Sequence, residues 1–141
     1  MEKLLFTGGT GFLGKNARPI LDKMYEVTTC GITPDDMIKV NFVTDVPNLP
    51  ERYDVVLHAC GKVHILPKTA EEIKSFFDVN YQGTINLCKG LEKVGVPKAL
   101  VFISTVAVYG CDFGELITED HPLNGETPVS YTHLTLPTIL R

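Results

Sequence analysis

Short apolar runs alternate with amphipathic stretches along this chain, in the order typical of alternating strands and helices. Residues 3–7 form an apolar run that stops at two glycines, which predicts a buried strand ended by a turn. From Phe12 to Met24, apolar side chains recur at steps of three and four residues. This spacing predicts a helix, and Pro19 inside it is expected to cause a kink.

Four further apolar runs predict strands at residues 26–30, 37–43, 54–59 and 99–104. The run at 37–43 precedes a polar stretch with prolines and is expected near an edge of the sheet. The run at 99–104 has almost no polar alternation, which is typical of a parallel sheet covered on both faces. Strands that alternate with helices favour an α/β fold built from right-handed βαβ units.

A long helical pattern separates the last two predicted strands. Residues 69–72 have the capping-box pattern, and apolar residues then follow one helical face as far as Leu91, before Gly95 ends the helix. Asn80 lies on this apolar face, and a buried amide needs hydrogen-bond partners. Two interpretations stay open and are compatible: Asn80 ties neighbouring backbone together, or it orders a cofactor site.

Composition excludes several classes of protein. The 141 residues include 13 Lys and Arg against 17 Asp and Glu, with a formal net charge of −4 and 44% hydrophobic residues. This length fits one core. The acidic balance argues against nucleic-acid binding, and no apolar run is long enough for a membrane span. The opening segment lacks the pattern of a secretory signal, so we expect a cytoplasmic protein.

The cysteines and histidines give no sign of a metal site. No C-x-x-C pair and no histidine at zinc-ligand spacing is present, so reduced thiols are expected. His58 is interpreted as a packed or capping residue without a chemical role, and His64 as a loop residue. Glycine, proline and acidic residues predict a loop over residues 110–128.

Three glycines stand between the first predicted strand and its helix. Gly8 can make the tight turn, Gly11 lets the backbone approach a pyrophosphate, and Gly14 lets the helix pack closely. Free N–H groups at the helix N-terminus would hold the anion. The acidic residue that usually contacts the adenosine ribose is expected at residues 29–31, where the chain has Thr-Cys-Gly, so NAD and NADP both stay open.

Two other segments follow the carboxyl ends of predicted strands. Residues 58–61 (His-Ala-Cys-Gly) follow the fourth strand, and residues 104–110 (Ser-Thr-Val-Ala-Val-Tyr-Gly) begin at the end of the fifth. Ligands of open α/β sheets bind at this edge. A hydroxyl at the start of the second segment would face the nicotinamide of a bound dinucleotide.

Four segments in register, residues 7–14, 54–61, 80–84 and 104–110, resemble those of the extended short-chain dehydrogenase/reductases. The nearest branch is the NAD-dependent epimerase/dehydratases, and the resemblance covers residues 3–127. It implies a Rossmann-type doubly wound parallel sheet with strand order 3-2-1-4-5, of which this chain holds the N-terminal part.

The resemblance also implies a cofactor, NAD or NADP, and a small-molecule substrate, a nucleotide sugar. It gives Thr105 a catalytic role, because the aligned residue hydrogen-bonds the reacting oxygen, and it places the adenine near Asn41 and Phe42. The parent protein would be an epimerase, dehydratase or reductase, with a homodimer left open; the alternative is a regulatory module that keeps fold and cofactor without chemistry. The implied cofactor-binding residues are Gly8, Gly11, Phe12, Leu13, Gly14, Asn41, Phe42, Ala59, Cys60, Gly61 and Asn80.

The family's base is a tyrosine four residues before a lysine, expected about 25 residues after Thr105. Tyr131 lies near this place, but residue 135 is threonine and no lysine follows Lys98. Residues 129–138 also resemble the translation of a transposase mosaic-end sequencing adapter. We therefore expect a truncated NAD(P)-binding domain over residues 1–128 and a non-native tail over 129–141. Tyr131 would then be a coincidence and the fragment inactive.

Overall fold

The computed structural model describes residues 1–62, 67–111, 113–127 and 130. Within them, five parallel strands form one sheet in the order β3-β2-β1-β4-β5, which confirms the predicted order. The expectations for His64 and Tyr131 fall outside the described residues. The strands are β1 (Glu2–Thr7), β2 (Tyr25–Gly31), β3 (Ile38–Lys39), β4 (Val55–His58) and β5 (Ala99–Phe102).

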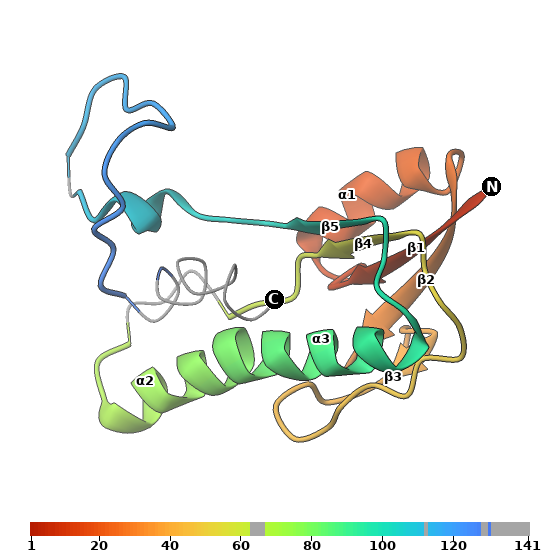
Figure 1. Ribbon diagram of the computed structural model, residues 1–141. Helices are drawn as coiled ribbons and strands as arrows, with labels where there is room; N and C mark the ends of the chain where they lie inside the picture. Colours follow the sequence, from red (N-terminus) through yellow and green to blue (C-terminus); the bar gives the residue numbers. More distant parts are fainter. Residues whose placement is uncertain (63–66, 112, 128–129, 131–141) are drawn as a thin grey trace.

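Helices lie on both faces of this sheet (Figure 1). One face carries α1 (Phe12–Leu21), and the other carries α2 (Ala70–Phe77), the π-helical turn η1 (Asp78–Gln82) and α3 (Gly83–Val94). A short 3₁₀ turn, η2 (Val106–Tyr109), follows β5. In the part of the chain that the structure describes, no helix has the length and apolar character needed to cross a membrane.

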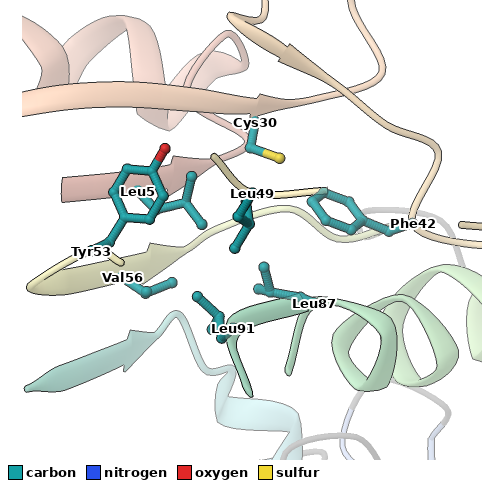
Figure 2. Close-up of a cluster of buried hydrophobic side chains, with 8 residues drawn as sticks. All are labelled: Leu5, Cys30, Phe42, Leu49, Tyr53, Val56, Leu87 and Leu91. Carbon is teal, nitrogen blue, oxygen red and sulfur yellow. The ribbon is translucent and has the colours of Figure 1, made fainter. Parts of the chain in front are cut away.

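The main core fills the space between the sheet and α3 (Figure 2). Leu5 of β1 and Val56 of β4 point from the sheet, and Leu87 and Leu91 point from α3. Tyr53, directly before β4, closes one side of the cluster and is 1% exposed. These apolar contacts hold α3 in a fixed position on the sheet, because each buried leucine contributes about 1.5–3 kcal/mol by its transfer from water.

The other face is built differently, because α1 lies on it through a glycine. Gly14 is the buried residue of α1, and a Cβ at this position would lie 2.2 Å from the backbone of Gly9. Phe12 and Ile20, which belong to the predicted apolar face, are 88% and 63% exposed. The helix begins at the predicted residue and ends at Leu21, earlier than Met24.

The third strand is shorter than predicted, two residues in place of 37–43. Asn41 ends it, because its side-chain oxygen accepts a hydrogen bond from Val43 N (3.1 Å) and its carbonyl accepts one from Thr44 N (3.1 Å). The turn directs Phe42 into the core, where 7% of the residue is exposed. An asparagine that caps its own turn competes with the sheet, which explains the early end.

The long predicted helix after residue 69 is interrupted by a wide turn. The capping box forms as expected, with Thr69 accepting from Glu72 N and the Glu72 carboxylate accepting from Thr69 N. At residues 78–82, however, the helix widens into the π-helical turn η1, with Asn80 inside it. Such turns are frequent at functional sites. The predicted loop is confirmed for residues 110–111 and 113–127, which form no helix or strand.

Candidate functional site

A cavity of about 1200 Å³ opens at the carboxyl edge of the sheet. The segments that follow β1, β2, β4 and β5 line it, together with side chains from α2 and η1. This is the edge at which open α/β sheets bind ligands. The volume is sufficient for a ligand of the size of a dinucleotide.

The structure brings most of the predicted site residues to this cavity and leaves three outside its lining. Asn41 is exposed and Phe42 is packed in the core, while Gly14 supports the loop from behind. The predicted placement of adenine near Asn41 and Phe42 therefore has no support in the cavity. The predicted residues that line it are Gly8, Gly11, Phe12, Leu13, Ala59, Cys60, Gly61, Asn80 and Thr105.

The glycine loop is as tight as its sequence suggests. Gly8 has φ +74°, and a Cβ there would lie 2.9 Å from backbone atoms of Ala59 and Cys60, so the loop after β1 packs directly on the loop after β4. The Gly11 N–H donates to the Gly8 carbonyl (3.0 Å), which closes the turn. Both predicted roles, the tight turn at Gly8 and the close packing at Gly14, are confirmed.

The first turn of α1 is left available to an anion. Gly11 is the N-cap in an extended conformation, and among the described residues no side chain caps it and no acidic side chain occupies the first turn. The first backbone N–H groups of a helix lack partners within the helix. Since Gly11, Phe12 and Leu13 line the cavity, these donors and the positive end of the helix dipole face the space where a phosphate would lie.

His58 links three elements through a buried hydrogen-bond chain. Its Nδ1 lies 2.5 Å from the Thr7 hydroxyl, and its Nε2 lies 3.0 Å from the Thr84 hydroxyl. The Thr84 hydroxyl donates to the Asn80 carbonyl (2.6 Å), so its oxygen accepts from the Nε2–H of His58. Phe102 stacks on the ring at 5.1 Å. The interpretation of His58 as a packed residue is confirmed.

Asn80 fixes the loop after β4 through both ends of its amide. Its Oδ1 accepts from Lys62 N (2.7 Å) and its Nδ2 donates to the Lys62 carbonyl (3.0 Å). A Cβ on Gly61 would lie 3.0 Å from the same Oδ1, so the loop fits closely over the amide. The π-helical turn brings Asn80, 7% exposed, to this position beside the cavity. The backbone-tying role of Asn80 is therefore observed.

Thr105 is the N-cap of η2 and lines the cavity. Its hydroxyl oxygen accepts a hydrogen bond from Ala107 N (3.2 Å), which caps the 3₁₀ turn. A hydroxyl that accepts in this bond keeps its own proton for another acceptor. Thr105 can thus donate to an oxygen of a molecule in the cavity.

The thiols near the site are poor nucleophiles. Burial raises the pKa of Cys30 to about 12, and burial followed by the Asp36 charge raises the pKa of Cys60. Both thiols therefore stay protonated at neutral pH, and the thiolate is the reactive form. Cys60 lines the cavity but is unsuited to covalent catalysis. The four cysteines form no disulfide among the described residues, and no group of three metal-ligating side chains is found there.

The loop after β2 also lines the cavity, which the sequence reasoning missed. Gly31, Ile32, Thr33 and Asp36 all contribute to the wall. The acidic residue was expected at residues 29–31, whereas Asp36 lies five residues beyond the end of β2 and lines the cavity. The acidic side chain at position 36 was the available signal, but only the folded loop shows where it points.

Comparisons with known proteins identify the family and support the fold. A model of the "NAD dependent epimerase/dehydratase family" matches residues 4–141. The chain is 29% identical over 160 residues to UDP-glucose 4-epimerase of Bacillus subtilis (strain 168), across 98% of this chain and 47% of that protein. It therefore spans about half the length of this curated relative.

Two solved structures share the fold. The WbmG enzyme of Bordetella bronchiseptica, in complex with NAD and UDP, has a TM-score of 0.71 at 20% identity, over 99% of this chain and 49% of that one. RMD from Pseudomonas aeruginosa, complexed with NADPH, has a TM-score of 0.76 at 23% identity, over 99% of this chain and 48% of that one. One of these proteins holds NAD and the other NADPH.

Proposed function

Because the chain belongs to the NAD-dependent epimerase/dehydratase family, we propose that it forms the cofactor-binding part of an enzyme that oxidises or reduces a hydroxyl or keto carbon of a nucleotide sugar. The observation that carries this proposal is the cavity itself. It joins the glycine loop and the open N-terminus of α1 to the Thr105 hydroxyl. Epimerisation, dehydration and reduction all begin with chemistry at such a carbon.

The residues that line the cavity fit a dinucleotide. Gly11 leaves room for a pyrophosphate against the backbone, and the first N–H groups of α1 supply donors for its oxygens. Ala59, Cys60 and Gly61 form the adjoining wall, and Asn80 holds this loop through its hydrogen bonds to Lys62. When bound, the nicotinamide supplies a carbon that takes up or releases a hydride.

Thr105 acts on the substrate in this proposal. Its proton is donated to the substrate oxygen on the reacting carbon, while Ala107 N keeps the hydroxyl oriented. Such a bond orients the carbon toward the cofactor and stabilises negative charge on the oxygen. The His58 chain supports this geometry from behind, because it ties β1, β4 and α3 together beneath the cavity.

The proton transfer itself needs a group that the printed sequence lacks. A tyrosine with a lysine four residues later would take the substrate proton, and no lysine follows Lys98. We therefore propose that the 141-residue chain binds cofactor but does not turn over a nucleotide sugar. Turnover of UDP-glucose by this chain would contradict that part of the proposal.

Cofactor binding is tested by fluorescence titration of NADH with the 141-residue chain and with Gly11→Ala. Gly11 has φ −76°, which alanine also adopts, so this variant is expected to fold while its Cβ obstructs the pyrophosphate. We expect a loss of affinity of about tenfold or more. Gly83→Ala is the matched control, since a Cβ there meets only an ordinary contact at 3.4 Å and Gly83 does not line the cavity. Equal NADH affinity in all three proteins would contradict the proposed site.

A second candidate is a regulatory module that binds the cofactor without chemistry. The observation in its favour is the missing Tyr-x-x-x-Lys pair. We propose instead that residues 129–141 derive from a sequencing adapter and that the pair lies in the parent gene beyond residue 128. The family match runs through residue 141, so a native segment is the competing outcome. Amplifying and sequencing the gene from its source DNA separates them: a Y-x-x-x-K motif there supports the enzyme, and the same codons as printed support the module.

A further inference from the structure

Asp36 is a buried carboxylate with an unused acceptor. It lies in the loop after β2, is 4% exposed and lines the cavity. Its Oδ2 accepts from Thr33 N (3.0 Å) and from the Thr33 hydroxyl (2.8 Å). Its Oδ1 is buried and has no hydrogen-bond partner among the described residues. An unsatisfied buried acceptor is costly, and a charged one especially so, which points to a donor supplied by a ligand.

This carboxylate occupies the place of a side chain that residue 31 does not have. Gly31 is the last residue of β2, where dinucleotide-binding folds usually carry an acidic residue. A Cβ on Gly31 would lie 2.6 Å from Asp36 Oδ2 and 3.1 Å from Asp36 Cγ. The acid that is missing from the strand is thus replaced, in the same volume, by an acid from the loop.

The loop holds Asp36 beside the glycine turn. The Thr33 hydroxyl, which donates to Asp36, lies 3.1 Å from the Thr10 hydroxyl in the glycine loop. Met37 N donates to the Thr29 hydroxyl (3.1 Å), which ties the far end of the loop back to β2. Asp36 is therefore fixed at both sides, next to the turn at which the pyrophosphate would bind.

We propose that Asp36 accepts hydrogen bonds from the adenosine ribose hydroxyls and makes this chain selective for NAD over NADP. The inference rests on the proposed dinucleotide site. A 2′-phosphate in this position would face a carboxylate, and the described lining of the cavity contains no lysine or arginine to neutralise it. The fold alone does not decide this preference, since solved proteins of this fold hold NAD in one case and NADPH in another. In this chain the selectivity would come from one loop residue, Asp36.

The test compares ADP-ribose with 2′-phospho-ADP-ribose by calorimetric titration of the 141-residue chain. We expect ADP-ribose to bind at least about tenfold more tightly, because a like charge beside the 2′-phosphate is unfavourable. Asp36→Asn keeps the shape of the side chain and removes its charge, so it should weaken ADP-ribose binding and bring the two affinities close together. Asp35→Asn, which makes the same charge change on an exposed neighbour, should leave both affinities unchanged.

A double variant that moves the carboxylate from the loop to the strand distinguishes a loss of selectivity from a loss of folding. Asp36→Ser combined with Gly31→Asp returns the carboxylate to the strand and relieves the 2.6 Å contact, so it should restore the preference for ADP-ribose. Equal binding of both probes by the unmodified chain, or an unchanged preference in Asp36→Asn, would overturn the inference and leave the dinucleotide site intact. Failure to bind either probe or NADH would overturn the proposed function as well.

Discussion

The two faces of the sheet are covered by helices in different ways. On the α3 face, interlocking aliphatic side chains such as Leu87 (0% exposed) and Leu91 (3%) form the core. On the α1 face, Gly14 brings the helix against the glycine turn, while Phe12 and Ile20 stay exposed. The two helices lie on opposite faces of the sheet (Figure 1). One stabilises the fold by burial, and the other places its N-terminal residues Phe12 and Leu13 in the lining of the cavity.

This difference shows what an amphipathic pattern means. Both helices have apolar side chains at helical spacing, yet only α3 buries its apolar face on the sheet. The spacing determines which side chains share a face. It does not determine whether another element covers that face.

The largest expected effect is the difference in stability between substitutions in α3 and in α1, the helices on the two faces of the sheet. Leu87→Ala should lower the free energy of unfolding by about 2–5 kcal/mol, because it leaves a cavity in a close-packed core. Ile20→Ala, on the exposed side of α1, should change it by less than about 0.5 kcal/mol. Urea denaturation of both variants checks this. Similar losses would show that α1 also buries its apolar side chains.

Close packing at Gly14 can be tested with a substitution that usually favours helices. Alanine in place of glycine within a helix normally stabilises by up to about 1 kcal/mol. Gly14→Ala should instead destabilise by about 1–3 kcal/mol, because its Cβ would lie 2.2 Å from Gly9. Gly83→Ala in α3 has room and serves as the control in the same denaturation series. A stabilised Gly14→Ala would contradict the close approach of α1.

The polar link between η1 and the loop after β4 should have an intermediate effect. Asn80→Ala removes two hydrogen bonds to Lys62 and should cost about 1–3 kcal/mol, with faster hydrogen exchange at the Lys62 amide. Asn16→Ala removes an exposed bond from the Asn16 side chain to the Phe12 carbonyl and is the control. An unchanged hydrogen-exchange rate at the Lys62 amide in Asn80→Ala would show that Asn80 does not hold the cavity wall in place.

The smallest effect lies at the opposite edge of the sheet, away from both helical faces. The Lys3 N–H bond, followed by the Lys98 ammonium, lowers the pKa of Asp54 below its ordinary 3.8. The pKa of Asp54 is lower in the folded state than in the unfolded state. The stabilisation is therefore complete above the unfolded-state pKa and is lost as the pH falls through the folded-state pKa. Asp54→Asn should flatten the acid side of a stability–pH profile. An unchanged stability–pH profile would show that Asp54 does not contribute to the loss of stability in acid.

Much of the site could be predicted because it depends on local chemistry. A strand, three spaced glycines and a helix predict a phosphate loop wherever they occur together, and Gly8 with φ +74° shows why glycine is needed. Asn41 and Phe42 lie outside the cavity lining, because an asparagine turn ends β3 early and directs Phe42 into the core. Asp36 was missed because its role depends on a loop that folds back onto Gly31.

The sequence by itself determined the order of strands and helices and the glycine turn, since these follow from periodicity and backbone conformation over a few residues. It also indicated the family, through the resemblance of four motifs in register. Only the tertiary structure decided which apolar faces are covered, where the π-helical turn places Asn80, and which carboxylate reaches the cavity. The physical reason is that burial and hydrogen-bond partners come from residues far apart in the chain. Asn80 is bonded to Lys62, and His58 to Thr7 and Thr84, only after the sheet has formed.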